Sequence, residues 1–247
     1  MSVTDSTVPA FRLEIGQTDD PTPDPFSFVE LPTGEFLMGG SDEDRYVSAV
    51  ELPRREMTVS QRIAMGRSPV TQCEWSRFRK SAAPTSNGSC LPVSGVTWEE
   101  AVEYGEWLST QTGKRCRLPT EVEWEYAARA GKDALFPSGR NRLSLNEANY
   151  LYDEMGDPVG RGYKTPIGSY PPNPFGLFDM SGNINEWTSS PWTRSPGEIS
   201  ATPGTRFVTK GGSWDQLPRT MRCSARDWAV RSECHDNLGF RLVVELD

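Results

Sequence analysis

Thiols, the side chains that most often carry redox chemistry, are few and scattered in this sequence. No C-x-x-C pair occurs, and the number of cysteines is odd; they are Cys73, Cys90, Cys116, Cys223 and Cys234. This pattern favours buried, reduced thiols in a cytoplasmic protein over a disulfide framework. A Cys223–Cys234 bond is the alternative.

Imidazole chemistry has one residue to draw on, His235. A Ser–His–Asp triad would need His235 beside Ser213 or Ser224, with Asp227 or Asp236 as the orienting carboxylate, and nothing in the spacing supports it. The glycine-rich fingerprints G-x-G-x-x-G and G-x-x-x-x-G-K-[ST] are absent, so no phosphate cradle is predicted.

Charge and hydropathy exclude further classes of function. The 247 residues carry a net charge of −8, and the arginines between residues 219 and 231 alternate with acidic residues, so no basic stripe for a nucleic acid is predicted. No apolar run approaches the roughly 20 residues that span a bilayer, and residues 1–16 resemble no secretory signal. We therefore expect a cytoplasmic protein that binds neither nucleic acid nor membrane.

Secondary-structure signals are clearest in the first half of the chain. Residues 1–26 read as an extended lead-in, residues 26–40 as a hairpin around the turn sequence PTGE, and residues 57–66 as a further strand. Three Thr-x-x-Glu capping boxes begin helices at Thr71, Thr97 and Thr120. The second helix should run over 98–112 and the third over about 121–130, each followed by a glycine.

Residues 132–182 show no sustained periodicity and are rich in Gly, Pro and Asn. Their aromatic residues argue against disorder. An irregular segment of this length needs a brace, and loops this long are often functional.

Several motifs occur together in a fixed order, among them GEFLMGG, SPVTQCEWSRF, RLPTEVEWEYAARAG, FDMSGNINEW, KGGSW and NLGFRLV. In this order they resemble the formylglycine-generating enzyme (sulfatase-modifying factor) family over residues 27–247. The resemblance implies a single irregular α+β domain of the C-type-lectin type, low in regular secondary structure and braced by calcium.

The resemblance also suggests where one or two calcium ions would bind, since Ca²⁺ prefers six to eight oxygen ligands. A first site would use the Asp179 and Glu186 carboxylates with the carbonyls of Gly182 and Ile184. A second would use Asn149, Asp157 and the carbonyls of Tyr150 and Val159. In the alternative, Asp179 and Glu186 only cap turns and pair with arginines.

The sequence departs from the family where the family's copper chemistry resides. The founding enzyme carries two cysteines within about ten residues after its GGS motif, and thiolates suit Cu(I), whereas this chain reads WDQLPRTM there. Asn185 precedes Glu186, at the position where the family usually has a tryptophan before the glutamate of its NxWEW motif. Some relatives bind iron through three histidines, and this chain has one histidine, so it cannot form such a site by itself. We expect no copper and no formylglycine-generating activity.

Two functions of different classes remain. The first is recognition of a protein or small molecule by the segment between GGSW and GFR, whose surface would comprise Trp214, Asp215, Gln216, Leu217, Arg219, Met221, Asp227 and Arg231. Aromatic, Met and Arg side chains are typical of interaction hot spots. The second is a metal- or oxygen-dependent oxidoreductase with a non-thiol mechanism, acting on a peptide or small natural product. Its candidate pocket residues are Ser213, Asn185, Arg226 and Trp228.

Overall fold

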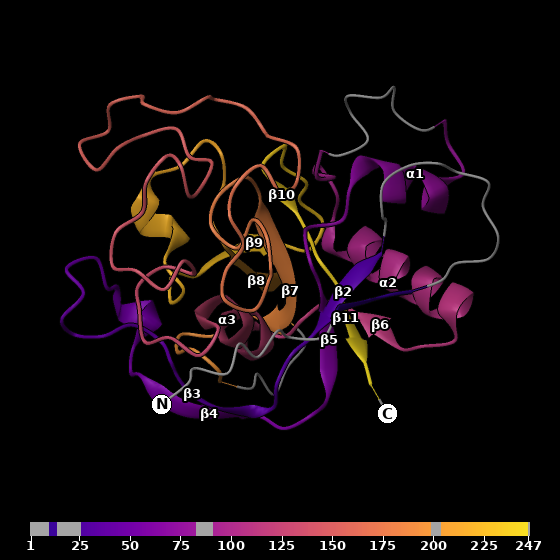
Figure 1. Ribbon diagram of the computed structural model, residues 1–247, viewed down its shortest axis with the longest axis horizontal. Helices are drawn as coiled ribbons and strands as arrows, with labels where there is room; N and C mark the ends of the chain where they lie inside the picture. Colours follow the sequence, from indigo (N-terminus) through magenta and orange to yellow (C-terminus); the bar gives the residue numbers. More distant parts are fainter. Residues whose placement is uncertain (1–9, 14–25, 83–90, 199–203, 247) are drawn as a thin grey trace, which may run out of the picture.

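The computed structural model describes residues 10–13, 26–82, 91–198 and 204–246. Its largest sheet has five strands, and every neighbouring pair is antiparallel. In spatial order they are β1 (Ala10–Arg12), β2 (Ser27–Glu30), β5 (Ile63–Gly66), β11 (Val243–Glu245) and β6 (Cys116–Arg117). The last strand of the chain thus lies inside the sheet, next to β5 (Figure 1).

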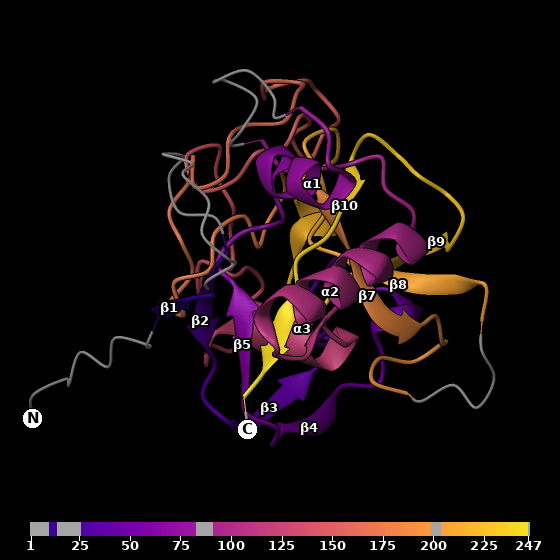
Figure 2. The ribbon, with the colours of Figure 1, turned by 90° about the vertical axis from the view of Figure 1, so that its right-hand side faces the viewer.

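A second sheet carries the segment that the sequence marked for function. Its spatial order is β10 (Leu238–Gly239), β7 (Asn185–Pro191), β8 (Arg206–Lys210) and β9 (Asp227–Val230), with β10 parallel to β7 and the other pairs antiparallel. A two-stranded ribbon of β3 (Gly34–Met38) and β4 (Arg55–Val59) lies at the bottom of the molecule in Figure 2.

The predicted hairpin over 26–40 is wrong. β2 pairs with β1 and β5, whereas β3 leaves that sheet and pairs with β4. The single strand predicted over 57–66 is likewise two strands, β4 and β5, in different sheets. Alternation reveals strands but not their partners, because pairing depends on contacts made far along the chain.

The three helices begin where the capping boxes predict. They are α1 (Gln72–Arg79), α2 (Trp98–Thr112) and α3 (Glu121–Arg129). In each, the threonine hydroxyl accepts the N3 backbone N–H while the N3 glutamate accepts from the N-cap N–H, so both elements of the box are formed. α2 packs against β6 of the five-stranded sheet, and α3 lies between the ribbon and the second sheet.

Buried asparagines hold the long irregular segment. Between α3 and β7 the described chain contains only isolated bridges (Figure 1). Asn183 accepts the Thr165 N–H at 2.9 Å and donates to the Thr165 carbonyl at 3.1 Å. Asn173 donates to the Ala127 carbonyl at 2.7 Å. These amides supply the backbone partners that no helix or sheet provides.

The expected lead-in is only partly described. Residues 10–13 form β1 and its flank, while 1–9 and 14–25 lie outside the described residues, so the boundary at residue 26 stays a prediction. In the described part of the chain, no helix is long and apolar enough to cross a membrane.

Candidate functional site

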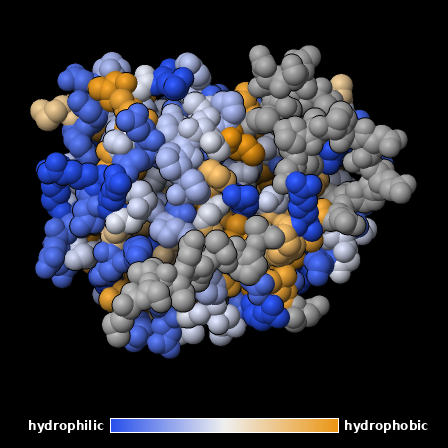
Figure 3. Space-filling view, in the orientation of Figure 1, coloured by the Kyte–Doolittle hydropathy of each residue, from blue (hydrophilic) through white to orange (hydrophobic). Residues whose placement is uncertain are grey.

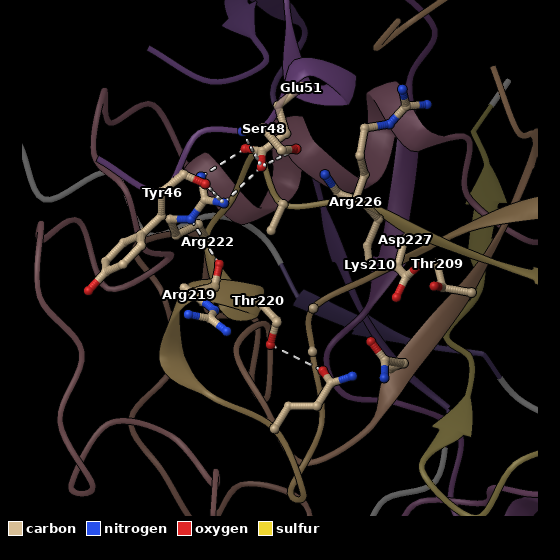
Figure 4. A pocket seen from close by; sticks show the side chains of 15 residues that line it. Tyr46, Ser48, Glu51, Thr209, Lys210, Arg219, Thr220, Arg222, Arg226 and Asp227 are labelled. Carbon is tan, nitrogen blue, oxygen red and sulfur yellow. Dashed lines mark hydrogen bonds and ion pairs between the residues drawn. The ribbon is translucent and has the colours of Figure 1, made fainter. Parts of the chain in front are cut away.

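A pocket of about 210 Å³ opens where β7, β8 and β9 meet two short 3-10 helices, η1 (Ala49–Glu51) and η2 (Pro218–Met221). Figure 4 shows its polar lining. The described lining residues are Tyr46, Ser48, Glu51, Asn185, Thr209, Lys210, Gly211, Gly212, Gln216, Arg219, Thr220, Arg222, Ala225, Arg226 and Asp227.

Arg222 fixes one wall of this pocket. Its buried guanidinium donates to Asp44 Oδ2 at 2.5 Å and to both Glu51 oxygens at 2.8 Å. It also donates to the Tyr46 carbonyl at 3.0 Å. Burial opposes ionisation of Glu51, but the hydrogen bonds and charge of Arg222 hold the pKa of that carboxyl below its ordinary value. Segment 44–51 is thereby attached to the end of η2.

The cations deeper in the pocket are paired as well. Lys210 Nζ, which is fully buried, lies 3.1 Å from Glu125 Oε2 and donates to the Cys223 carbonyl at 2.9 Å. Arg226 Nε lies 2.6 Å from Glu121 Oε1, and its Nη1 donates to the backbone carbonyls of Val50 and Thr193. Burial raises the pKa of Glu121. These charges are structural, because their partners already satisfy them.

Two charged side chains at the rim differ from the rest. Arg219 is exposed, and its guanidinium has no partner among the described residues. Asp227 is also exposed, and its Oδ1 accepts only the N–H of the next residue, at 2.8 Å. Figure 4 shows the two side chains on opposite sides of the pocket. A cation and an anion thus lie at the pocket with no ion pair between them among the described residues.

Ser213 lies beneath the pocket rather than on its surface. It is fully buried, and its hydroxyl donates to Asp215 Oδ1 at 2.6 Å while accepting from Asn185 Nδ2 at 3.1 Å. Asn237 donates to both Asp215 oxygens. The hydroxyl therefore orients Asn185, which does line the pocket.

Two further predicted site residues lie elsewhere than the sequence interpretation placed them. Trp228 does not line the pocket, because successive residues of β9 point to opposite faces and Asp227 occupies the pocket side. Its ring is covered by the Arg206 guanidinium at 3.9 Å. Met221 is not a surface residue: it is fully buried against Phe136 and Tyr150.

The remaining residues of the predicted surface separate. Gln216, Arg219 and Asp227 line the pocket together with Asn185 and Arg226 of the other predicted set. Trp214, Asp215 and Leu217 are half-buried, and Arg231 pairs with Glu99 at 2.9 Å on another part of the surface. The two sets that the sequence kept apart therefore meet at one pocket.

No described lining residue is a cysteine or histidine. Cys73, Cys116 and Cys223 are buried free thiols, and the exposed Cys234 forms no disulfide with Cys223. Burial raises the pKa of Cys223 to about 12, so it remains a thiol. Cys90 lies outside the described residues.

The triad alternative finds no support in the geometry. His235 is exposed and its nearest charged partner is Glu233, at 3.7 Å. Ser224 donates to Glu51 at 2.7 Å, and Ser213 donates to Asp215. Neither serine is therefore aligned with an imidazole base.

The second predicted calcium set fits a cation in part. Asn149 Oδ1 is buried without a hydrogen-bond partner, and its Nδ2 is held by Tyr163 and Asn183. Chain 151–160 folds back so that a side chain on Gly160 would collide with the Tyr150 carbonyl. An orphaned amide oxygen is the kind of ligand atom that Ca²⁺ accepts. Asp157 and Val159 lie on the exposed part of this fold.

The first predicted calcium set does not fit. Glu186 is fully buried; it accepts from Arg241 Nε and Nη2 and from Trp124 Nε1, each at 2.7 Å. Asp179 accepts the Gly168 N–H at 3.0 Å, and burial raises its pKa to about 6. The Gly182 carbonyl accepts the Ile184 N–H. This is the alternative arrangement, with a capped turn and an arginine pair. Among the described residues, no three His, Cys, Asp or Glu side chains gather as a metal site.

Sequence reasoning missed the wall formed by Tyr46, Ser48 and Glu51. These residues are far from η2 in the chain: Arg222 reaches Glu51 across 171 positions. Their contact with Arg222 depends on the fold, so no local pattern in the sequence could indicate that they belong to the pocket.

Fold and site together define an irregular α+β domain of small, mostly antiparallel sheets, with a polar pocket at the four-stranded sheet. The sulfatase-modifying factor enzyme 1-like domain model matches residues 17–246. The chain belongs to this family, as a single domain low in regular secondary structure.

Three similar proteins place the chain within the family. The formylglycine-generating enzyme of Mus musculus is 35% identical over 194 residues, 72% of this chain and 50% of that protein, so the chain spans half that relative's length. The inactive C-alpha-formylglycine-generating enzyme 2 of Mus musculus is 29% identical, covering 93% and 88%. The structure of PvdO from Pseudomonas aeruginosa has a TM-score of 0.82 at 27% identity, covering 97% and 99%.

Proposed function

We propose that this protein is a recognition member of the sulfatase-modifying factor family, which binds a protein or small-molecule ligand at the pocket bounded by Arg219, Asp227, Gln216 and Asn185. The observation that carries the proposal is the contrast within this pocket. Its deep charges are paired, whereas Arg219 and Asp227 at the rim are not. Polar groups held in a fixed geometry and left without partners are what a specific ligand site requires.

Two further facts support recognition. The lining offers amides, hydroxyls and paired charges, with no described thiolate or imidazole to hold a redox metal. A mouse relative that is similar over most of the chain carries the word inactive in its name. The fold therefore persists where the family's oxidation does not take place.

An oxidoreductase with a non-thiol mechanism is the second candidate. It is supported by membership of a family that contains formylglycine-generating enzymes and by the polar character of the pocket. Asn185, held by Ser213, and Arg226, held by Glu121, would then orient the substrate.

The test compares the wild-type protein with the double variant Arg219→Ala/Asp227→Ala and with Arg231→Ala, an exposed arginine outside the pocket. Proteins and metabolites retained by each immobilised protein are identified by mass spectrometry. We expect at least one ligand that wild type and Arg231→Ala retain and the double variant loses. Equal retention by all three would contradict the proposal. Oxygen uptake with added copper or iron and a cysteine peptide would favour the second candidate.

We also propose that calcium braces the irregular segment at the second predicted set. Asn149 Oδ1, the Tyr150 carbonyl, Asp157 and the Val159 carbonyl would hold the ion, and water molecules would supply its remaining ligands. The orphaned Asn149 oxygen supports this. The ion would supply structural stabilisation, and the pocket residues act independently of it.

A further inference from the structure

We infer that the ligand of this pocket is a zwitterion, a molecule that presents a carboxylate to Arg219 and an ammonium group to Asp227. This inference rests on the proposed function and adds the chemical class of the ligand. Its basis is the juxtaposition of one unpaired cation and one unpaired anion on opposite sides of a small pocket.

Most of the charges that line the pocket already have partners. The other ionised side chains that line the pocket are Glu51, Lys210, Arg222 and Arg226, and each has a partner of opposite sign within 3.1 Å. A ligand could displace these partners only by leaving a buried charge uncompensated, which is costly. Arg219 and Asp227 are the pair whose charges a ligand can meet at no such cost.

The charges of Arg219 and Asp227 do not pair with each other. No ion pair joins them in the described structure: Asp227 accepts only a backbone N–H. Arg219 belongs to η2 and Asp227 to β9, and both elements are anchored. Arg222 ties the end of η2 to Asp44 and Glu51, while β9 is paired to β8 over four residues. The scaffold therefore fixes the backbone positions from which the two charged side chains extend.

The pocket is small, and most of its lining residues are polar. A pocket of about 210 Å³ holds one residue-sized group, and the amides of Asn185 and Gln216 also belong to its lining. Arginine binds a carboxylate with paired, charge-assisted hydrogen bonds, and a carboxylate binds an ammonium group in the same manner. The face of the molecule seen in Figure 3 is mostly hydrophilic around its irregular loops.

The experiment uses the standard free L-amino acids as probes of the full chain, by thermal shift and then titration calorimetry. We expect at least one to bind at millimolar or lower concentration. Its N-acetyl form lacks the ammonium charge and its carboxamide lacks the carboxylate. Each derivative should bind about 10- to 100-fold more weakly, the loss expected for one charge-assisted hydrogen bond.

The variants assign each end of the probe. Arg219→Gln should bind the acid and the carboxamide equally, and Asp227→Asn should bind the amine and its N-acetyl form equally. Arg231→Gln and Asp42→Asn, exposed residues outside the pocket, should discriminate as the wild type does. Binding of no free amino acid, or discrimination unchanged in the pocket variants, would overturn the inference. If the immobilised protein still retained a ligand that depends on Arg219 and Asp227, the proposed function would stand without it.

Discussion

Replacing Arg222 by methionine should test whether one buried side chain maintains the pocket wall. Only 4% of the Arg222 side chain is exposed, against 1% for Asp44 and 3% for Glu51. Arg222→Met keeps the apolar stem but leaves two buried carboxylates without their cation. Removing one partner of a buried ion pair costs about 3–5 kcal/mol. In a chain of this length the melting temperature should fall by roughly 6–20 °C.

The cost of Arg222→Met should depend on pH, because Glu51 can be protonated. While Arg222 is present, the pKa of Glu51 lies below its ordinary value of 4.5. The stability that Glu51 contributes is therefore complete above pH 4.5 and is lost as the pH falls through the lower folded-state pKa. Without Arg222, protonating Glu51 removes an uncompensated buried charge. The stability difference between variant and wild type should consequently narrow between about pH 7.5 and about pH 5.

Urea denaturation of both proteins at the two pH values measures this difference. Arg231→Met is the matched control, because its ion pair with Glu99 is exposed and such pairs contribute about 0–1 kcal/mol. Adding Glu51→Gln to Arg222→Met should recover part of the loss. A loss no larger than that of the control, or a difference that widens as the pH falls, would refute the reasoning.

Three further predictions concern the scaffold. Asn183→Ala should lower the free energy of unfolding by about 1–3 kcal/mol, because it leaves the Thr165 backbone groups buried without partners; urea denaturation measures it. Calcium added to chelator-treated protein should raise the melting temperature, and Asn149→Ala should abolish the rise; an unchanged melting temperature in wild type would end the calcium proposal. Iodoacetamide should label Cys234 in the native protein and Cys223 only after denaturation, because Cys223 is buried with a pKa of about 12; peptide mapping that found both labelled at equal rates would contradict this.

Helices could be predicted from the sequence because their signals are local. A threonine and a glutamate three residues apart satisfy each other's backbone groups, and a glycine with positive φ ends α2 at residue 113. Strand pairing could not be predicted in this way. β2 and β3 are joined by three residues yet belong to different sheets, since their partners β5 and β4 come later in the chain.

The candidate site shows the same division. The sequence located the segment 215–231 but not which of its side chains face the pocket. The orientation of β9 turns Asp227, and not Trp228, toward the pocket. The packing of η2 buries Met221 and leaves Arg219 exposed. The calcium sets were inferred from a resemblance. The structure offers an orphaned amide at Asn149 and pairs Glu186 with an arginine, a pairing that depends on residues 55 positions apart.

Stability and recognition are carried by different side chains in this pocket, and this makes the proposal testable without the usual ambiguity. Arg222 is buried and has several partners, so its loss should disturb the fold. Arg219 and Asp227 are exposed and have no charged partner in the described structure, so Arg219→Gln and Asp227→Asn should change the free energy of unfolding by no more than about 0.5 kcal/mol. If either variant instead unfolds far more readily, its charge has a structural partner and cannot be reserved for a ligand. If both keep wild-type stability, any loss of binding reports on recognition alone.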